Sequence, residues 1–184
     1  MTTQQRRENH RNPVPAVDSI ISKDHNLKIL LVRRKNDPFK GMLSIPGGFI
    51  NEGETAEDAM LREAKEEISL ILEPTAILGV YSDPSRDPRM HTISVTFITK
   101  TVRGNEAPND DAAALQWINV EDELDRLIQS NPVAFDHSKI LTDFTNWRNA
   151  TQGSDEENNK IPTFWSTKKR EAGTEEIFRG KPSD

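Results

Sequence analysis

The feature that most constrains this chain is a run of charged residues at fixed spacing, which begins at Gly48. It reads GFINEGETAEDAMLREAKEEISL over residues 48–70 and follows the pattern G-x5-E-x7-R-E-A-x-E-E. At ordinary residue frequencies, such a set of positions coincides on the order of once per ten million starting points. The pattern therefore predicts one structural unit, a loop followed by a helix, that gathers carboxylates in one place.

The local sequence of this unit favours a helix over residues 56–68. Thr55 has the chemistry of an N-cap, and the residues that follow it contain neither Gly nor Pro and are rich in Ala, Leu, Met, Glu and Lys. Glu63, Glu66 and Glu67 are spaced i, i+3 and i+4, so a helix places them on one face. The segment thus predicts three neighbouring carboxylates.

Three neighbouring carboxylates predict a metal site. Like charges this close destabilise an exposed helix by roughly 0.2–0.5 kcal/mol per pair, and a shared divalent cation removes that repulsion. Oxygen ligands suit Mg²⁺, with Mn²⁺ as an alternative. A merely solvated acidic face is the competing interpretation. The turn Pro46-Gly47-Gly48 and the set distances to Glu54 and Arg62 argue against it, because a solvated face requires none of them.

A second segment, YSDPSRDPRMHTISVTF at residues 81–97, places Arg86, Asp87 and Arg89 on one loop before a predicted strand. In a chain with a net charge of −6, arginines beside a metal-carboxylate site could bind a phosphate group. The alternative is a turn held together by pairs between Asp87 and the arginines. The residues alone leave both interpretations open. Arg33, Phe49 and Tyr81 complete the candidates for substrate binding.

Composition limits the classes of protein that the chain can belong to. Its 184 residues favour one domain, and the acidic net charge argues against binding to nucleic acid. The absence of cysteine excludes disulfides and thiolate metal sites. The N-terminal residues lack the apolar core of a signal peptide, so we expect a cytoplasmic protein with no membrane partner.

Local patterns predict the order of the elements around the box helix. Strands are expected at 16–21, 27–33, 76–81, 92–102 and 114–119, helices at 121–129 and 138–147, and Pro74 is expected to mark the exit from the box helix. Residues 1–12 read as a flexible arm and residues 13–147 as the domain. Residues 148–184 read as a polar tail that either docks on the domain or a second subunit, or stays disordered.

The charged pattern resembles the Nudix box of pyrophosphohydrolases that act on nucleoside diphosphate derivatives. The resemblance implies an α+β fold, a Nudix-type α/β/α sandwich with a mixed sheet. It also implies metal binding by the Gly47 carbonyl and by Glu63, Glu66 and Glu67, with Glu54 and Arg62 in support. One departure is Ser69, which stands where the family usually has Gly, and we expect it to change the exit of the helix.

The second segment is similar to the ADP-ribose pyrophosphatase branch of this family, and so are PVPAVDSII, APNDDAAALQWI and AFDHSKIL elsewhere in the chain. This resemblance covers about residues 12–147 and implies hydrolysis of ADP-ribose to AMP and ribose 5-phosphate. Glu63 is the first choice for the general base, and Glu106, Asp110 and Asp111 are alternatives. Phe39, Phe49 and Tyr81 are candidates for an adenine wall.

Two other functions stay open at this stage. One is hydrolysis of another nucleoside diphosphate derivative, such as NADH, a dinucleotide or an oxidised nucleotide. The other is a sensor without catalysis, because regulators of NAD metabolism share the arginine-loop motif. The intact box and the short stretch after residue 147, too small for a winged-helix domain, favour a hydrolase. A small-molecule substrate is expected in each case, and the resemblance leaves a homodimer open.

Overall fold

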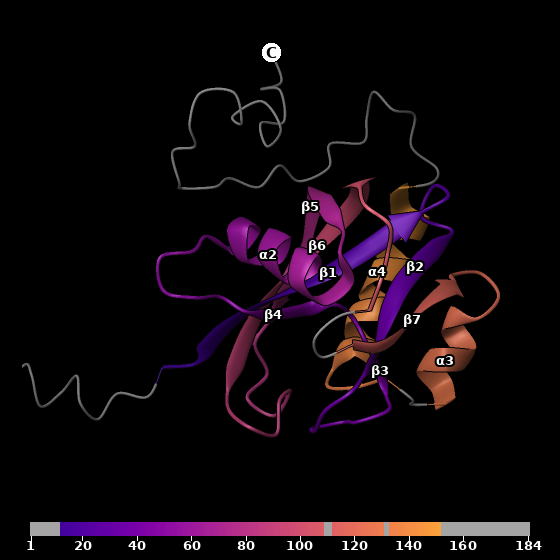
Figure 1. Ribbon diagram of the computed structural model, residues 1–184. Coiled ribbons are helices and arrows are strands. Elements are labelled where there is room, and N and C mark those ends of the chain that lie inside the picture. Colours follow the sequence, from indigo (N-terminus) through magenta and orange to yellow (C-terminus); the bar gives the residue numbers. More distant parts are fainter. Residues whose placement is uncertain (1–11, 109–111, 131–132, 152–184) are drawn as a thin grey trace, which may run out of the picture.

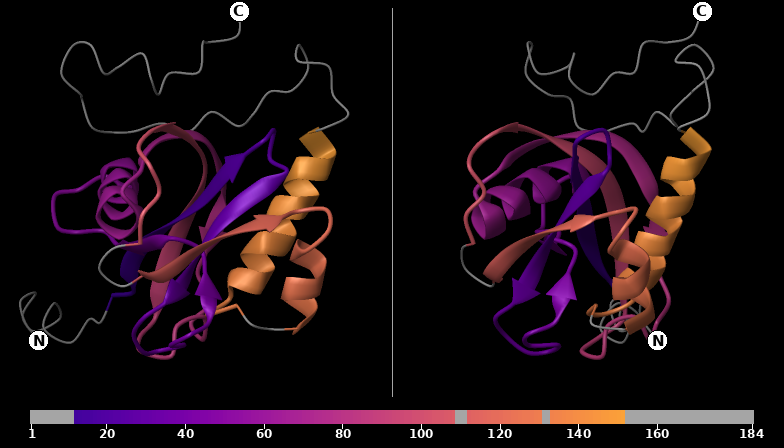
Figure 2. Two further views of the ribbon diagram at one scale, coloured as in Figure 1. Left: turned by 45° about the vertical axis from the view of Figure 1, so that its right-hand side comes forward. Right: turned by 90° about the vertical axis from the view of Figure 1, so that its right-hand side faces the viewer.

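The computed structural model describes residues 12–108, 112–130 and 133–151, which form a seven-stranded sheet between helices (Figure 1). Its strands are β1 (Val14–Lys23), β2 (Lys28–Arg34), β3 (Leu43–Ser44), β4 (Gly47–Phe49), β5 (Ile71–Tyr81), β6 (Thr92–Arg103) and β7 (Ala112–Asn119). Its helices are α2 (Ala56–Ile68), α3 (Leu124–Ser130) and α4 (His137–Thr151). Figure 2 shows α2 on one face of the sheet and α4 on the other. The predicted α/β/α sandwich is confirmed.

The sheet is mixed, as predicted, and β1 lies at its centre. The strand order is β3-β2-β1-β6-β5, with β4 also paired to β1 and β7 to β2. β1 runs parallel to β6 and antiparallel to β2 and β4. In this register, Asp18 of β1 lies opposite Gly47 on one side and Thr96 on the other. β1 therefore stands between the glycine turn and the strand that follows the arginine loop.

Both faces of β1 and β2 are buried, because successive side chains of a strand point to opposite faces and helices cover each face. Ile20 and Leu31 belong to a core cluster that includes residues of α3 and α4. Ile21 and Leu30 belong to a second cluster, which includes residues of α2. The sheet thus rests on two apolar layers, and the site elements lie at its edges and strand ends.

The fold differs from the predicted elements in several places. β5 begins at Ile71 rather than at 76, and Pro74 lies inside it instead of directly after the helix. Proline is tolerated there because β5 is an edge strand that pairs only with β6, and the register shifts between Pro74 and Ala76. The short strands β3 and β4 were not predicted as strands, since two or three residues carry no periodic signal.

The predicted boundary at residue 147 lies within α4, which continues to Thr151. Residues 1–11 of the predicted arm and residues 152–184 of the predicted tail lie outside the described residues. No helix in the described part of the chain has the length and apolarity that crossing a membrane requires.

The exit of α2 corrects the expectation about Ser69. Ser69 adopts the left-handed conformation, with φ 60° and ψ 24°, that Gly usually supplies at this position. Its N–H donates to the carbonyl of Lys65 at 3.2 Å, and the N–H of Leu70 donates to Ala64 at 3.3 Å. The exit is therefore the usual one, and the serine bears a backbone cost that glycine would avoid.

Replacing Ser69 with glycine should raise the free energy of unfolding by about 1 kcal/mol, because glycine adopts the left-handed region without steric cost. Urea denaturation of the wild type and the variant measures this difference. Ser69→Ala serves as the control, because it removes the hydroxyl but keeps the β-carbon in the left-handed region. Equal stability of the glycine variant and the wild type would contradict a strained cap.

Candidate active site

The start of α2 is organised by Thr55 and Arg62. The Thr55 hydroxyl accepts a hydrogen bond from the N–H of Asp58 at 3.1 Å, which confirms the predicted N-cap. Arg62 binds both oxygens of Glu54, with Nε–Oε1 at 2.7 Å and a second contact at 3.0 Å. It also donates to the carbonyl of Phe49 at 2.9 Å. The arginine thus joins the loop before the helix to the helix itself.

Arg62 also neutralises two acids of the box. Its NH1 group lies 2.7 Å from Glu63 Oε1 and 2.9 Å from Glu66 Oε2. The hydrogen bond from Arg62 holds the pKa of Glu54 at about 2, far below its usual value. Burial raises the pKa of Glu63 instead, although its bond to Arg62 works in the opposite direction. These box acids therefore lie in different electrostatic environments.

Glu63 and Glu67 line one cavity of about 240 Å³, together with Gly47 and Gly48, and we call it the carboxylate cavity. Glu67 accepts a hydrogen bond from the N–H of Gly47 at 3.2 Å. A β-carbon at Gly48 would overlap the Glu63 carboxylate, so a larger residue there would displace this side chain from its present position. Glu66 is half exposed, points to Arg62 and does not line this cavity.

The donor set of the carboxylate cavity fits a divalent metal ion in chemistry. Two carboxylates and the Gly47–Gly48 backbone face the same space and offer hard oxygen atoms. Among the described residues, however, no three carboxylates or histidines come together as a metal-binding cluster in this structure. Arg62, bonded to both Glu63 and Glu66, supplies the counter-charge instead.

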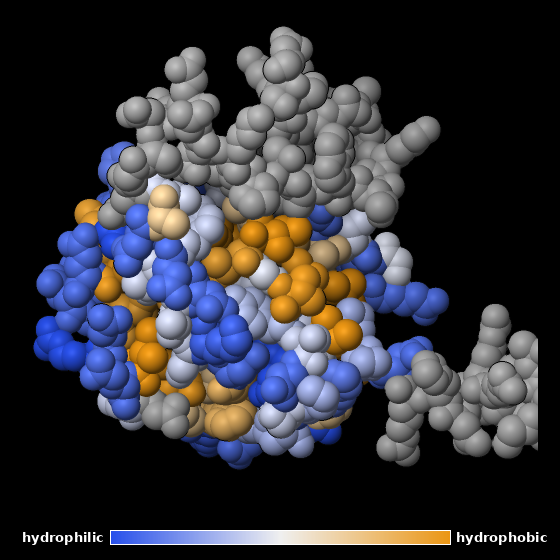
Figure 3. Space-filling model, turned by 180° about the vertical axis from the view of Figure 1, so that it is seen from behind, coloured by the Kyte–Doolittle hydropathy of each residue, from blue (hydrophilic) through white to orange (hydrophobic). Residues whose placement is uncertain are grey.

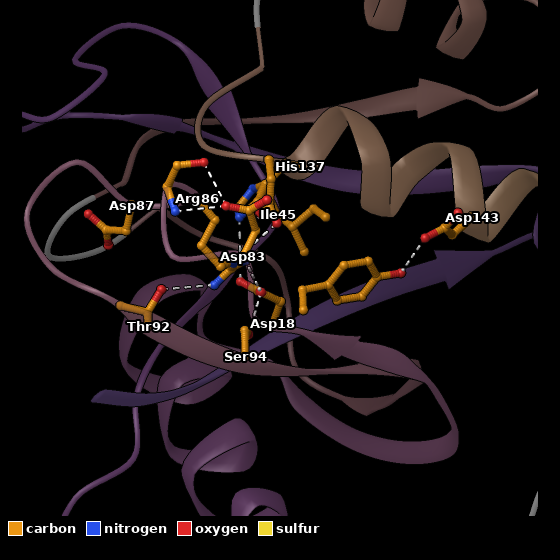
Figure 4. Close-up of polar contacts among 12 residues, drawn as sticks. Asp18, Ile45, Asp83, Arg86, Asp87, Thr92, Ser94, His137 and Asp143 are labelled. Atoms are coloured by element: carbon orange, nitrogen blue, oxygen red, sulfur yellow. Dashed lines mark hydrogen bonds and ion pairs between the residues drawn. The ribbon is translucent and has the colours of Figure 1, made fainter. Parts of the chain in front are cut away.

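Arg86, expected at a substrate-binding surface, is buried in a polar network that Figure 4 shows. Its guanidinium binds both carboxylate oxygens of Asp136, at 2.8 and 3.0 Å, and lies 3.4 Å from Asp18. Asp18 in turn accepts a hydrogen bond of 2.5 Å from the Ser94 hydroxyl. The hydrogen bond to Asp136 and the charge of Asp18 raise the pKa of Arg86 against the opposing effect of burial.

His137 completes this network. The backbone N–H of Ile45 donates to His137 Nδ1 at 2.9 Å, which leaves the ring proton on Nε2, 3.6 Å from Asp18. Burial lowers the pKa of His137, so the ring is neutral near pH 7. Asp18, Asp136 and His137 were not predicted as site residues. An aspartate inside the apolar strand 16–21 and the segment AFDHSKIL, which holds Asp136 and His137, were the signals that could have pointed to them.

Arg89 is the more accessible arginine of the loop, with its side chain 39% exposed, and it lines the carboxylate cavity. It pairs with Asp87 at 2.8 and 3.0 Å, and hydrogen bonds from Arg89 lower the pKa of Asp87 against the effect of burial. Its guanidinium carbon lies 5.4 Å from the ring centre of Phe49 and 5.7 Å from that of Phe135. The pairing expected from the purely structural interpretation of the loop is thus present, and the guanidinium still borders the cavity.

Of the other substrate candidates, only Phe49 lines the carboxylate cavity. Arg33 donates to the carbonyl of Gly41 at 2.7 Å and to Gln116 at 3.1 Å, and lines neither that cavity nor the larger one described below. Its neighbour Arg34 lines the carboxylate cavity, because adjacent side chains of β2 point to opposite faces.

Tyr81 lies elsewhere, in the wall of a larger cavity beside α4. Its hydroxyl donates to Asp143 at 3.0 Å, and burial together with this bond raises the pKa of Tyr81. Of the three alternative bases, Glu106 is among the described residues. Glu106 accepts a hydrogen bond from Trp117 Nε1 at 2.9 Å and lines neither cavity, while Asp110 and Asp111 lie outside the described residues.

Comparison with known proteins identifies the family of this chain. The model of the NUDIX domain family matches residues 12–144. The chain therefore belongs to the Nudix family and is a Nudix hydrolase, as the spacing of the box predicted. It is 47% identical over 138 residues to the ADP-ribose pyrophosphatase of Methanocaldococcus jannaschii, with 75% of this chain and 76% of that protein covered.

Two solved structures share the fold. The NUDIX domain of Shewanella oneidensis NrtR complexed with ADP ribose has a TM-score of 0.62 and 26% identity, and the match covers 80% of this chain and 99% of that one. The bifunctional NMN adenylyltransferase/ADP ribose pyrophosphatase of Francisella tularensis, complexed with AMP and a manganese ion, has a TM-score of 0.65 and 25% identity. That match covers 79% of this chain and 44% of the other.

The depressed pKa of Glu54 makes a prediction about stability. Because the folded-state pKa is about 2 and the unfolded value is 4.5, the Glu54–Arg62 pair stabilises the fold fully above pH 4.5. That contribution is lost as the pH falls from 4.5 towards 2. The difference in unfolding free energy between wild type and Glu54→Gln should therefore be largest near pH 7 and shrink over this range.

Urea denaturation at pH 7, 4.5 and 3 without added metal measures the difference. Glu52→Gln is the matched control, because Glu52 is an exposed acid of the same loop for which no hydrogen bond to another described residue is found. A difference between wild type and Glu54→Gln that stays constant across this range would mean that the Glu54–Arg62 pair does not form in solution.

Proposed function

We propose that this protein hydrolyses the diphosphate bond of ADP-ribose to give AMP and ribose 5-phosphate. The observation that carries the proposal is that box glutamates and a loop arginine line the same carboxylate cavity. Glu63 and Glu67 line it together with Arg89. A diphosphate bridged to carboxylates by metal ions, with its remaining charge facing an arginine, fits such a cavity.

Glu63, Glu67 and the Gly47 carbonyl are the proposed ligands of Mg²⁺ or Mn²⁺ within the carboxylate cavity. Glu66 is proposed as a further ligand from the box pattern alone, and its side chain would have to turn from Arg62 towards the cavity to bind the ion. A bound ion would polarise the diphosphate and lower the pKa of the attacking water. The protein's own part is to hold these oxygens in place. Arg62 fixes Glu63 from one side, and the Gly47 N–H positions Glu67. Manganese in the related Francisella structure supports a divalent ion of this kind.

Glu63 remains our choice for the general base. It lines the carboxylate cavity, where a carboxylate could accept a proton from the attacking water. Glu106 is less well supported, since its hydrogen bond to Trp117 lowers its pKa and it lies away from that cavity. The proposal for Asp110 and Asp111 rests on the sequence alone.

ADP-ribose is proposed as the substrate because a relative 47% identical to this chain carries the name ADP-ribose pyrophosphatase, and a NUDIX domain of similar fold was solved with ADP ribose. Other nucleoside diphosphate derivatives form the second candidate, since the carboxylate cavity recognises the diphosphate that all of them share. The expected cytoplasmic location and the homodimer stay predictions.

Glu67→Gln should lower turnover of ADP-ribose by at least a hundredfold without loss of the fold, because it removes one charged ligand but keeps the size of the side chain. The rate of AMP production from ADP-ribose with Mg²⁺ measures this turnover. NADH, diadenosine polyphosphates and 8-oxo-dGTP are tested in parallel as alternative substrates. Glu52→Gln should retain full activity, and a chelator should abolish it until Mg²⁺ or Mn²⁺ is restored. Wild-type turnover in Glu67→Gln would remove this residue from the site. Binding of ADP-ribose without turnover of any substrate would favour a sensor.

The two loop arginines should respond differently to replacement. Arg89→Ala should mainly raise the KM for ADP-ribose and change stability little, because its side chain is 39% exposed and borders the carboxylate cavity. Arg86→Ala should cost about 3 kcal/mol of stability, because it removes the guanidinium partner of the buried Asp18 and the partly buried Asp136. Steady-state kinetics and urea denaturation separate the two effects. An Arg86→Ala variant with wild-type stability would contradict the structural role of this residue.

A further inference from the structure

The larger cavity beside α4, which we call the α4 cavity, lies next to the carboxylate cavity. It encloses about 760 Å³, within the range of sites that hold small organic ligands. Arg86 and Phe135 line both cavities, so the two spaces share a wall. Figure 4 shows Asp87, which lines the carboxylate cavity, and Asp143, which lines the α4 cavity, on opposite sides of Arg86.

The walls of the α4 cavity are aromatic and apolar. Phe39, Tyr81 and Trp147 contribute rings, and Trp147 is held by stacking on Phe144 at 5.9 Å between ring centres. Gly79 also lines the cavity, and a β-carbon there would lie 3.4 Å from the Tyr81 ring, so a side chain at this position would point into the cavity. Figure 3, which views the side that carries α4, shows patches of apolar residues there. Such walls suit a planar heterocycle, which stacks on aromatic rings.

The charges of the α4 cavity argue against a phosphate group. Its three aspartates outnumber its two basic residues, and unlike the carboxylate cavity it is lined by none of the proposed metal ligands that would offset the charge of a diphosphate. Arg86 binds Asp136, and Lys139 binds Asp143 at 2.8 Å. The carboxylates can instead accept hydrogen bonds from hydroxyl or amino groups. The uncharged end of a nucleotide fits this chemistry, whereas its phosphates fit the side where Arg89 lies.

We infer that the α4 cavity is the nucleoside subsite of this enzyme, and this inference rests on the proposed hydrolysis of a nucleoside diphosphate derivative. The base lies against the aromatic wall, and aspartates at the rim accept hydrogen bonds from the ribose hydroxyls. The diphosphate then lies beside Phe135, which borders both cavities, and reaches Glu63 and Glu67. Selection among nucleotides is made in the α4 cavity, and the carboxylate cavity reads only the diphosphate.

Gly79→Trp tests this assignment, because a side chain at Gly79 would face the Tyr81 ring and a large one would fill the cavity. Val102→Trp is the matched control, since Val102 is 60% exposed on the neighbouring strand and lines neither cavity. Isothermal titration calorimetry with AMP and with ribose 5-phosphate, in the presence of a chelator, measures binding without turnover. Thermal unfolding of both variants checks that each is folded.

We expect AMP to bind the wild type more tightly than ribose 5-phosphate does, and Gly79→Trp to weaken AMP binding at least tenfold. Val102→Trp should bind AMP as the wild type does. The inference is overturned if AMP binds Gly79→Trp normally, if both variants weaken AMP binding equally, or if the wild type does not prefer AMP. Failure to hydrolyse ADP-ribose, with the AMP results as expected, would instead reject the proposed reaction and leave the subsite in place.

Discussion

The buried contact between Arg86 and its two aspartates is the interaction on which the rest of the site depends. Asp18 comes from the central strand, Asp136 from the residues just before α4, and Arg86 from the loop between β5 and β6. Three distant parts of the chain therefore meet at one guanidinium. Because burying unpaired charges is costly, the loop has little freedom to take another position once these partners are in place.

This contact also determines which arginine is left for a ligand. With Arg86 occupied, Arg89 provides the guanidinium that borders the carboxylate cavity with a substantial part of its side chain exposed. His137 extends the same network to the backbone of Ile45, directly before the glycine turn. The turn that presents Gly47 and Gly48 to the box glutamates is thus linked to the arginine loop through buried polar contacts. One buried network therefore connects the elements that carry the glycine turn and the arginine loop, both of which border the carboxylate cavity.

The box could be predicted in detail because its contacts are local. Thr55, Arg62 and the glutamates lie within a few turns of one helix, so their spacing alone brings Arg62 to Glu63 and Glu66. The arginine loop was harder, since the pattern could not distinguish a buried arginine from an exposed one. Arg33 and Arg34 show the same difficulty. Their order in the chain does not tell which face of β2 meets the carboxylate cavity.

The sequence by itself therefore determined the carboxylate helix, because spacing acts over a short stretch of chain, and the resemblance of that spacing to the Nudix box implied the family and the mixed α/β/α architecture. Only the tertiary structure decided that Arg86 is buried and Arg89 borders the cavity, that Asp18 and His137 join them, and that Tyr81 lies in a separate cavity. Those outcomes depend on the parallel pairing of β1 with β6 and on where α4 begins. Both bring together residues far apart in the chain, whose proximity no local pattern records.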